Sequence, residues 1–153
     1  MELTLDLQNQ FRQEVILFEE MLSISRQQVA ALTNSDTDNN STDKFVKLVE
    51  KRQYLMNDID LLKSKIEVLE NELQTTGVTI DNKVAQIRYE YINRIRLVLG
   101  TIQKNDEICS RLAQEVLNKI AAKLTAVRTQ KKAYQAYTQD NSYGGAWFID
   151  KRK

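Results

Sequence analysis

Apolar side chains recur every three or four residues over most of this chain, and the longest run of that pattern covers residues 81–137. Such spacing keeps one face of a helix apolar over many turns, which is typical of a long helix packed against other helices. At a rise of 1.5 Å per residue, roughly 55 residues would form a helix about 80 Å long. The apolar positions are Val84, Ile87, Tyr91, Ile95, Val98, Ile102, Cys109, Leu112, Val116, Ile120, Leu124, Val127 and Tyr134.

Two shorter helices are predicted before it, over about residues 3–33 and 43–74. The first carries a double line of apolar residues, a stripe wide enough to touch two neighbours. The second alternates steps of three and four, as a coiled coil does. Residues 34–42 contain no apolar side chain and are rich in Asn, Asp and Ser, so we expect a flexible loop there. Ser41, Thr42 or Asp43 can cap the second helix.

The other boundaries follow from turn signals. Residues 75–82 include one Gly and a possible helix cap at Asp81, and they predict the second turn. Gly144 and Gly145 are expected to break the last helix, which leaves residues 138–153 as a flexible tail. With four Gly and no Pro, the chain does not suit a turn-rich β architecture. We therefore expect an all-α fold, with residues 1–153 as a single domain and three helices in an antiparallel, coiled-coil-like bundle.

The predicted helices differ in length, and this difference leaves apolar surface uncovered. The first two would each span roughly 45 Å, so they can cover only about half of the third. The remaining stripe must meet a second copy of the chain, the tail folded back, or an amphipathic helix of another protein. A kink at Gly100 would instead fold the third helix into a four-helix bundle, but no other turn signal lies beside it. The stripe comprises Leu112, Val116, Ile120, Leu124 and Val127.

Two polar residues interrupt the apolar seams, Arg52 in the second helix and Asn105 in the third. Two interpretations are open. Both side chains can lie at the edge of the bundle with their polar ends in water. Alternatively, they form buried polar contacts that set the register of the helices, as such residues do in coiled coils.

The net charge of +1 hides an asymmetry between the two halves of the chain. Residues 1–75 hold 8 Lys/Arg against 14 Asp/Glu, a balance of −6, whereas residues 76–153 hold 14 against 7, a balance of +7. The last predicted helix is basic beyond Glu115, and these cations are expected to form a solvated or intramolecularly paired surface, with an acidic protein partner as the alternative. Nucleic acid is not expected to bind, because these cations point to different sides of the helix and no aromatic residue lies among them before Tyr134.

Catalytic, metal-binding and cofactor-binding sites find little support. The chain has no His, and its single cysteine, Cys109, suits a small core position. The Gly pair precedes no helix, so a phosphate loop is not indicated. The first residues lack the pattern of a signal peptide, and no apolar window is long enough to span a membrane. We therefore expect a cytoplasmic protein without enzymatic activity, metal or cofactor.

Three stretches of the chain, taken in order, resemble a known family. The matching parts are Lys51-Arg52 in a Leu-rich helix, residues 102–107 (IQKNDE) with Ser110-Arg111-Leu112, and the tail from Ala133-Tyr134 to residues 147–151 (WFIDK). In this order the features resemble the flagellar type III export chaperones of the FlgN and FliT kind, with the FlgN-like branch slightly favoured. The resemblance covers most of the chain, and its most specific parts are the surroundings of Asn105 and the Phe-Ile-Asp-Lys ending.

The resemblance implies a small helical chaperone that binds the disordered C-terminal segment of a flagellar hook-associated or filament-cap protein. It would prevent premature assembly and bring this client to the membrane export gate. The client-binding residues would be Asn105, Leu112, Val116, Ile120, Leu124 and Val127. The tail would shield the groove or dock on the export machinery through Tyr134, Tyr137, Trp147 and Phe148.

Two other functions remain open at this stage. The long helices can pair with each other in an antiparallel coiled-coil homodimer or assembly subunit, which would leave no groove for a client. The protein can also be a regulator of the export ATPase, which would then be its partner.

Overall fold

The computed structural model of the chain describes residues 2–34, 40–77 and 82–151, with side-chain environments to residue 139. Three α-helices account for nearly all of these residues: α1 (Glu2–Thr33), α2 (Ser41–Thr75) and α3 (Asn82–Lys151). No strand occurs within the described ranges. The predicted all-α fold with two short helices and one long helix is therefore confirmed. Residues 35–39 and 78–81, which hold most of the predicted loop and the proposed Asp81 cap, lie outside the described residues.

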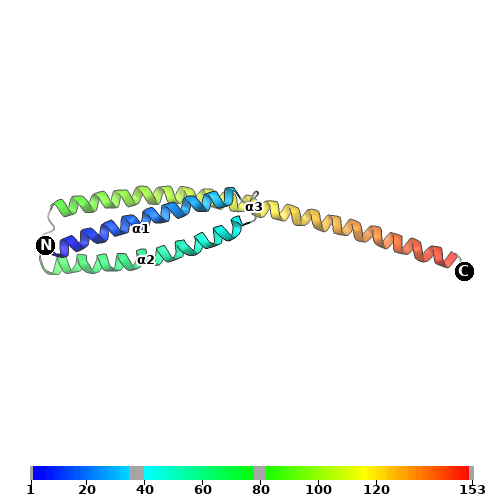
Figure 1. Cartoon of the computed structure of the whole chain (residues 1–153), viewed down its shortest axis with the longest axis horizontal. Coiled ribbons are helices and arrows are strands. Elements are labelled where there is room, and N and C mark those ends of the chain that lie inside the picture. The colour runs from blue at the N-terminus through cyan, green and yellow to red at the C-terminus, as the bar shows by residue number, and fades with distance from the viewer. Residues whose placement is uncertain (1, 35–39, 78–81, 152–153) are drawn as a thin grey trace. The chain divides into compact units, whose positions relative to one another are not determined.

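The chain divides into two compact units, residues 1–112 and 113–153. In the first unit α1, α2 and the beginning of α3 lie side by side as a bundle, with α2 antiparallel to the other two helices (Figure 1). The second unit consists of the remainder of α3. The single domain expected over residues 1–153 remains a prediction.

Two clusters of apolar side chains form the core of the bundle, and both come from the positions with steps of three and four. Burial of these side chains removes apolar surface from water and holds the helices together. The first cluster contains Leu7, Phe11, Leu62, Ile66 and Leu73. The second contains Phe18, Met21, Ile59, Val98 and Ile102.

Ion pairs along the bundle show how the three helices are aligned. Arg88 of α3 contacts Glu70 of α2 at 3.1 Å, and Arg94 of α3 contacts Glu19 of α1 at 2.7 Å. A second contact of each kind, Arg12 with Tyr91 and Arg52 with Asp106, shows that partners on α1 and α3 rise together in number, whereas partners on α2 and α3 run in opposite directions. These contacts agree with the parallel and antiparallel pairings seen in the bundle.

The structure bears on three predicted local features: the cap of α2, the kink at Gly100 and the turn that follows α2. The helix cap of α2 is Asn40, not a residue of the group 41–43, and it makes no side-chain capping hydrogen bond. Residue Gly100 lies within continuous α-helix, so α3 does not turn back there. At its other end α2 is followed by Gly77 with φ of +65°, a left-handed conformation that Gly adopts without steric cost.

The end of the third helix was predicted wrongly. We expected it near residue 137, but α3 continues through Gly144 and Gly145 to Lys151. Glycine in a helix interior costs only about 1 kcal/mol relative to Ala, and no proline is present to remove a hydrogen bond. The Gly pair alone is therefore not a sufficient stop signal.

Candidate functional site

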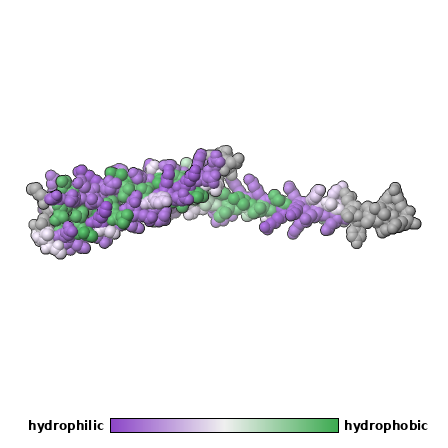
Figure 2. All heavy atoms as spheres, turned by 60° about the horizontal axis from the view of Figure 1, so that its bottom comes forward, coloured by the Kyte–Doolittle hydropathy of each residue, from purple (hydrophilic) through white to green (hydrophobic). Residues whose placement is uncertain are grey.

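One face of α3 changes from buried to exposed along its length. Its early apolar residues Val84, Val98 and Ile102 are 6%, 8% and 3% exposed. Its later residues Ile120, Leu124 and Val127, at the same helical spacing, are 48%, 52% and 57% exposed. Figure 2 shows hydrophobic side chains along this later part of α3. A row of apolar side chains in water is the feature that most needs a functional explanation.

We call this row the distal stripe, and we define it by residues of the second unit alone. Leu117, which is 59% exposed, belongs to it but was missed in the sequence. Its steps of three to Ile120 and of seven to Leu124 are the signal that could have identified it. The distal stripe comprises Val116, Leu117, Ile120, Leu124 and Val127.

The other predicted client-binding residues lie in different environments. Leu112, at the end of the first unit, is half-buried, and so is Val116 at the start of the stripe. Asn105 is half-buried in the bundle, where its Nδ2 donates a hydrogen bond to Ser25 Oγ at 2.9 Å. Ser25 is fully buried and donates in turn to the carbonyl oxygen of Leu22 at 2.8 Å. This contact gives Asn105 a partner within the protein.

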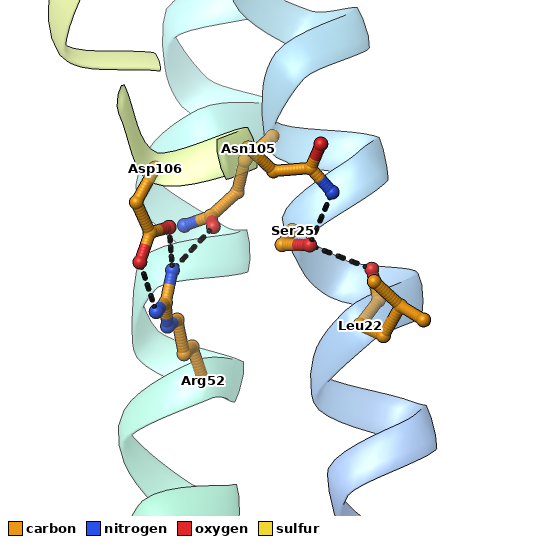
Figure 3. A network of polar contacts seen from close by, with 6 residues as sticks. Leu22, Ser25, Arg52, Asn105 and Asp106 are labelled. Carbon is orange, nitrogen blue, oxygen red and sulfur yellow. Dashed lines mark hydrogen bonds and ion pairs between the residues drawn. The ribbon is translucent and has the colours of Figure 1, made fainter. Parts of the chain in front are cut away.

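Arg52 makes polar contacts between helices close to Asn105 (Figure 3). Its Nη1 and Nη2 donate to the two carboxylate oxygens of Asp106 at 2.6 and 2.7 Å, and Nη1 also donates to Gln28 Oε1 at 3.2 Å. The hydrogen bond to Asp106 raises the pKa of Arg52, although partial burial opposes this. Arg52 therefore connects all three helices, since Gln28 lies on α1 and Asp106 on α3. Arg52 and Asn105 thus both make polar contacts between helices while half-buried, and their role in setting the register remains a prediction.

The residues proposed for the tail are only partly described. Tyr134 and Tyr137 are 71% and 67% exposed on α3. The side chains of Trp147 and Phe148 lie outside the described residues, and the roles proposed for all four remain predictions.

Positive charge surrounds the distal stripe. Residues 113–139 contain one acid, Glu115, and five cations: Lys119, Lys123, Arg128, Lys131 and Lys132. This part of α3 therefore combines exposed apolar side chains with a strong excess of positive charge, a combination that suits a partner with the opposite charge.

The arrangement offers little for catalysis. Among the described residues, no group of three or more His, Cys, Asp or Glu side chains is placed to hold a metal ion. Cys109 is half-buried, and its pKa is raised by burial and by the nearby Asp106, so its reactive thiolate form is disfavoured at neutral pH. The candidate site that the described residues offer is the exposed apolar row of the distal stripe.

Two further findings concern the chain as a whole. Of the helices in the described residues, none is both long and apolar enough to cross a lipid bilayer. The chain matches no protein-family model, no curated protein and no solved structure.

Proposed function

We propose that this protein is an export chaperone, whose distal stripe binds an amphipathic segment of a client protein. The observation that supports this proposal is the change along one face of α3 from a buried core to exposed apolar side chains. The steps of three and four that bury this face in the bundle continue through the stripe. A helix with a complementary apolar face would therefore pack there by the same side-chain geometry.

Neither α1 nor α2 is long enough to cover the whole of α3 within the bundle. α3 has 70 residues, whereas α1 and α2 have 32 and 35. Because rise per residue is constant, neither shorter helix can pack along more than about half of α3.

The exposed area implies weak, reversible binding. Full burial of a Val, Leu or Ile side chain contributes about 1.5–3 kcal/mol, and the exposed residues of the stripe are roughly half-buried already, which leaves about 1 kcal/mol each. The five residues would then contribute about 5 kcal/mol before the costs of ordering and association. A carrier that must release its client benefits from such modest affinity.

The resemblance to the FlgN and FliT chaperones supplies the identity of the client. By that resemblance the client is the C-terminal segment of a flagellar hook-associated or filament-cap protein, which the chaperone, acting in the cytoplasm, would keep from premature assembly and bring to the membrane export gate. We leave Asn105 out of the proposed binding surface, because its amide donates to Ser25 within the bundle.

A pair of variants with matched chemistry tests the proposal. Ile120→Asp with Leu124→Asp places two charges in the stripe, and Leu61→Asp with Val68→Asp places two on the exposed face of α2, where the side chains are 64% and 55% exposed. The probes are labelled peptides covering the C-terminal segments of the host bacterium's hook-associated and cap proteins. Fluorescence anisotropy should show that the α3 variant loses binding while the α2 variant keeps it.

Several results would count against the proposal. Equal binding by both variants would place the client elsewhere, and binding of none of the peptides by the native chain would remove the chaperone function. Sedimentation at several concentrations separates the alternative of an assembly subunit, since that function requires a stable dimer disrupted by the α3 variant. Binding to purified export ATPase, without binding to the peptides, would favour a regulator of that enzyme.

A further inference from the structure

We infer that the segment bound by the distal stripe is an acidic amphipathic helix, with Asp or Glu along both edges of its apolar face. This inference rests on the proposed function, because it assumes that the stripe binds a protein segment. It adds the charge pattern of that segment.

The positions of the cations around α3 carry the inference. Successive residues of an α-helix are rotated by about 100°, so angles around the axis follow from the numbering. Relative to Ile120, Val116, Leu124 and Val127 lie within about 40° and form the centre of the stripe. Lys123 lies about 60° to one side and Arg128 about 80° to the other, so each edge of the stripe carries a cation.

Two further charges lie near the stripe or opposite to it. Lys131 lies only about 20° from the direction of Ile120, one turn beyond Val127, so the stripe ends at a cation. Glu115, the one acid in the sequence between residues 113 and 139, lies about 140° away on the opposite face. Lys123, Arg128 and Lys131 are all exposed. A helix laid on the stripe would therefore meet positive charge at both edges and at one end.

A second copy of the same stripe does not suit this surface. In a symmetric pairing, Lys123 and Arg128 would face cations of the partner, and Glu115 would lie too far around the helix to offset them. Like charges brought together at the edge of an apolar seam oppose pairing, which is how coiled coils reject wrong partners.

An anionic lipid surface fits less well than a protein helix. Helices that lie in membrane interfaces carry Trp, Phe or Leu on the apolar face, and residues 113–139 contain Leu but neither Trp nor Phe. The spacing of the stripe is also continuous with the part of α3 that packs against helices in the bundle. We therefore assign the stripe to a helical partner and make lipid binding an outcome of the test.

The experiment uses three synthetic amphipathic peptides with one common Leu/Ile face. Their flanking positions hold Glu, Gln or Lys, and anisotropy is measured with the full-length protein at 50 and 500 mM salt. Three exposed ion pairs are together expected to make the Glu peptide bind about tenfold more tightly than the Gln peptide at low salt, with the Lys peptide weakest. At high salt the three affinities should converge, because exposed charges are screened.

Charge-reversal variants show whether the named cations are responsible. The triple change of Lys123, Arg128 and Lys131 to Glu should reverse the preference toward the Lys peptide. The same change in charge at Lys47, Lys65 and Lys83, which are exposed outside the stripe, is the matched control and should keep the Glu preference. Circular dichroism confirms that both variants remain helical.

The possible failures are distinguishable. If all three peptides bind equally to the native chain, and Ile120→Asp with Leu124→Asp removes that binding, the acidic inference is wrong while the proposed function stands. If no peptide binds, the proposed function fails together with the inference. Binding to vesicles of anionic phospholipid, without binding to any peptide, would overturn the inference in favour of a membrane surface.

Discussion

The ion pair between Arg52 and Asp106 offers a quantitative test of how burial determines the strength of a polar contact in this bundle. The two side chains form a bidentate pair and are 22% and 42% exposed. In a second Arg–carboxylate pair, Arg94 with Glu19, the shortest N–O distance is 2.7 Å, compared with 2.6 Å for Arg52 with Asp106. The Arg94 side chain is 63% exposed and that of Glu19 is 41% exposed. The two pairs therefore differ mainly in the burial of the arginine and in bidentate geometry.

The expected magnitudes follow from this difference. Exposed pairs typically contribute about 0.2–1 kcal/mol, whereas breaking a buried pair costs about 3–5 kcal/mol. Arg52 with Asp106 lies between these limits, so we expect a coupling free energy of about 1.5 kcal/mol. For Arg94 with Glu19 we expect about 0.5 kcal/mol or less. The single change Asp106→Ala should cost about 2 kcal/mol, because the half-buried guanidinium of Arg52 loses both carboxylate oxygens and keeps the weaker contact with Gln28.

Two double-mutant cycles measure these couplings. Each uses both single Ala variants and the double variant, and unfolding free energies come from urea titrations followed by circular dichroism. In 1 M NaCl the coupling of Arg94 with Glu19 should nearly vanish, while that of Arg52 with Asp106 should persist because salt screens buried charges less. Equal couplings for the two pairs, or an equal loss in salt, would refute the argument that burial and bidentate geometry strengthen the Arg52 contact.

Three further predictions concern backbone strain, proton binding and thiol reactivity. Gly100→Ala should raise the free energy of unfolding by about 0.5–1 kcal/mol, because the added Cβ meets open space in a helix. Gly77→Ala should lower the free energy of unfolding by about 1 kcal/mol, because φ is positive there. Urea titration measures both changes, and changes of the same sign would contradict the prediction. Burial raises the pKa of Glu14 above its ordinary value of 4.5, so the folded state binds a proton on this carboxyl group more tightly than the unfolded state does. The stability that this tighter proton binding contributes is present below about pH 4.5 and is lost as the pH rises through the folded pKa. The stability of Glu14→Gln relative to the native chain should therefore increase from about pH 4 to pH 7 in thermal melts, and a flat difference would exclude the effect. Cys109 should react with iodoacetamide at pH 8 more slowly in the folded protein than in urea, because burial raises its pKa; equal rates would show that the thiolate is not disfavoured.

Much of the fold was predictable from local pattern. The bounds of α1 and α2 came within two residues of the structure, because steps of three and four, together with the absence of proline, leave few alternatives to helix. The difference in length between α3 and the other helices was also predictable, since it depends only on residue counts. The errors lie at helix ends, where the cap at Asn40 and the continuation through residues 144 and 145 depend on small free-energy differences.

The candidate site divides in the same way. The apolar stripe is visible in the sequence because helical periodicity places its residues on one face without reference to any neighbour. Whether such a face is buried or exposed depends on which other segments reach it, so the burial of Val98 and the exposure of Leu124 appear only in the folded chain. The contact of Arg52 with Asp106 likewise joins residues 54 positions apart. Periodicity along one helix determines which residues share a face, but the register between helices decides their partners, because that register is set by the packing of all three helices together.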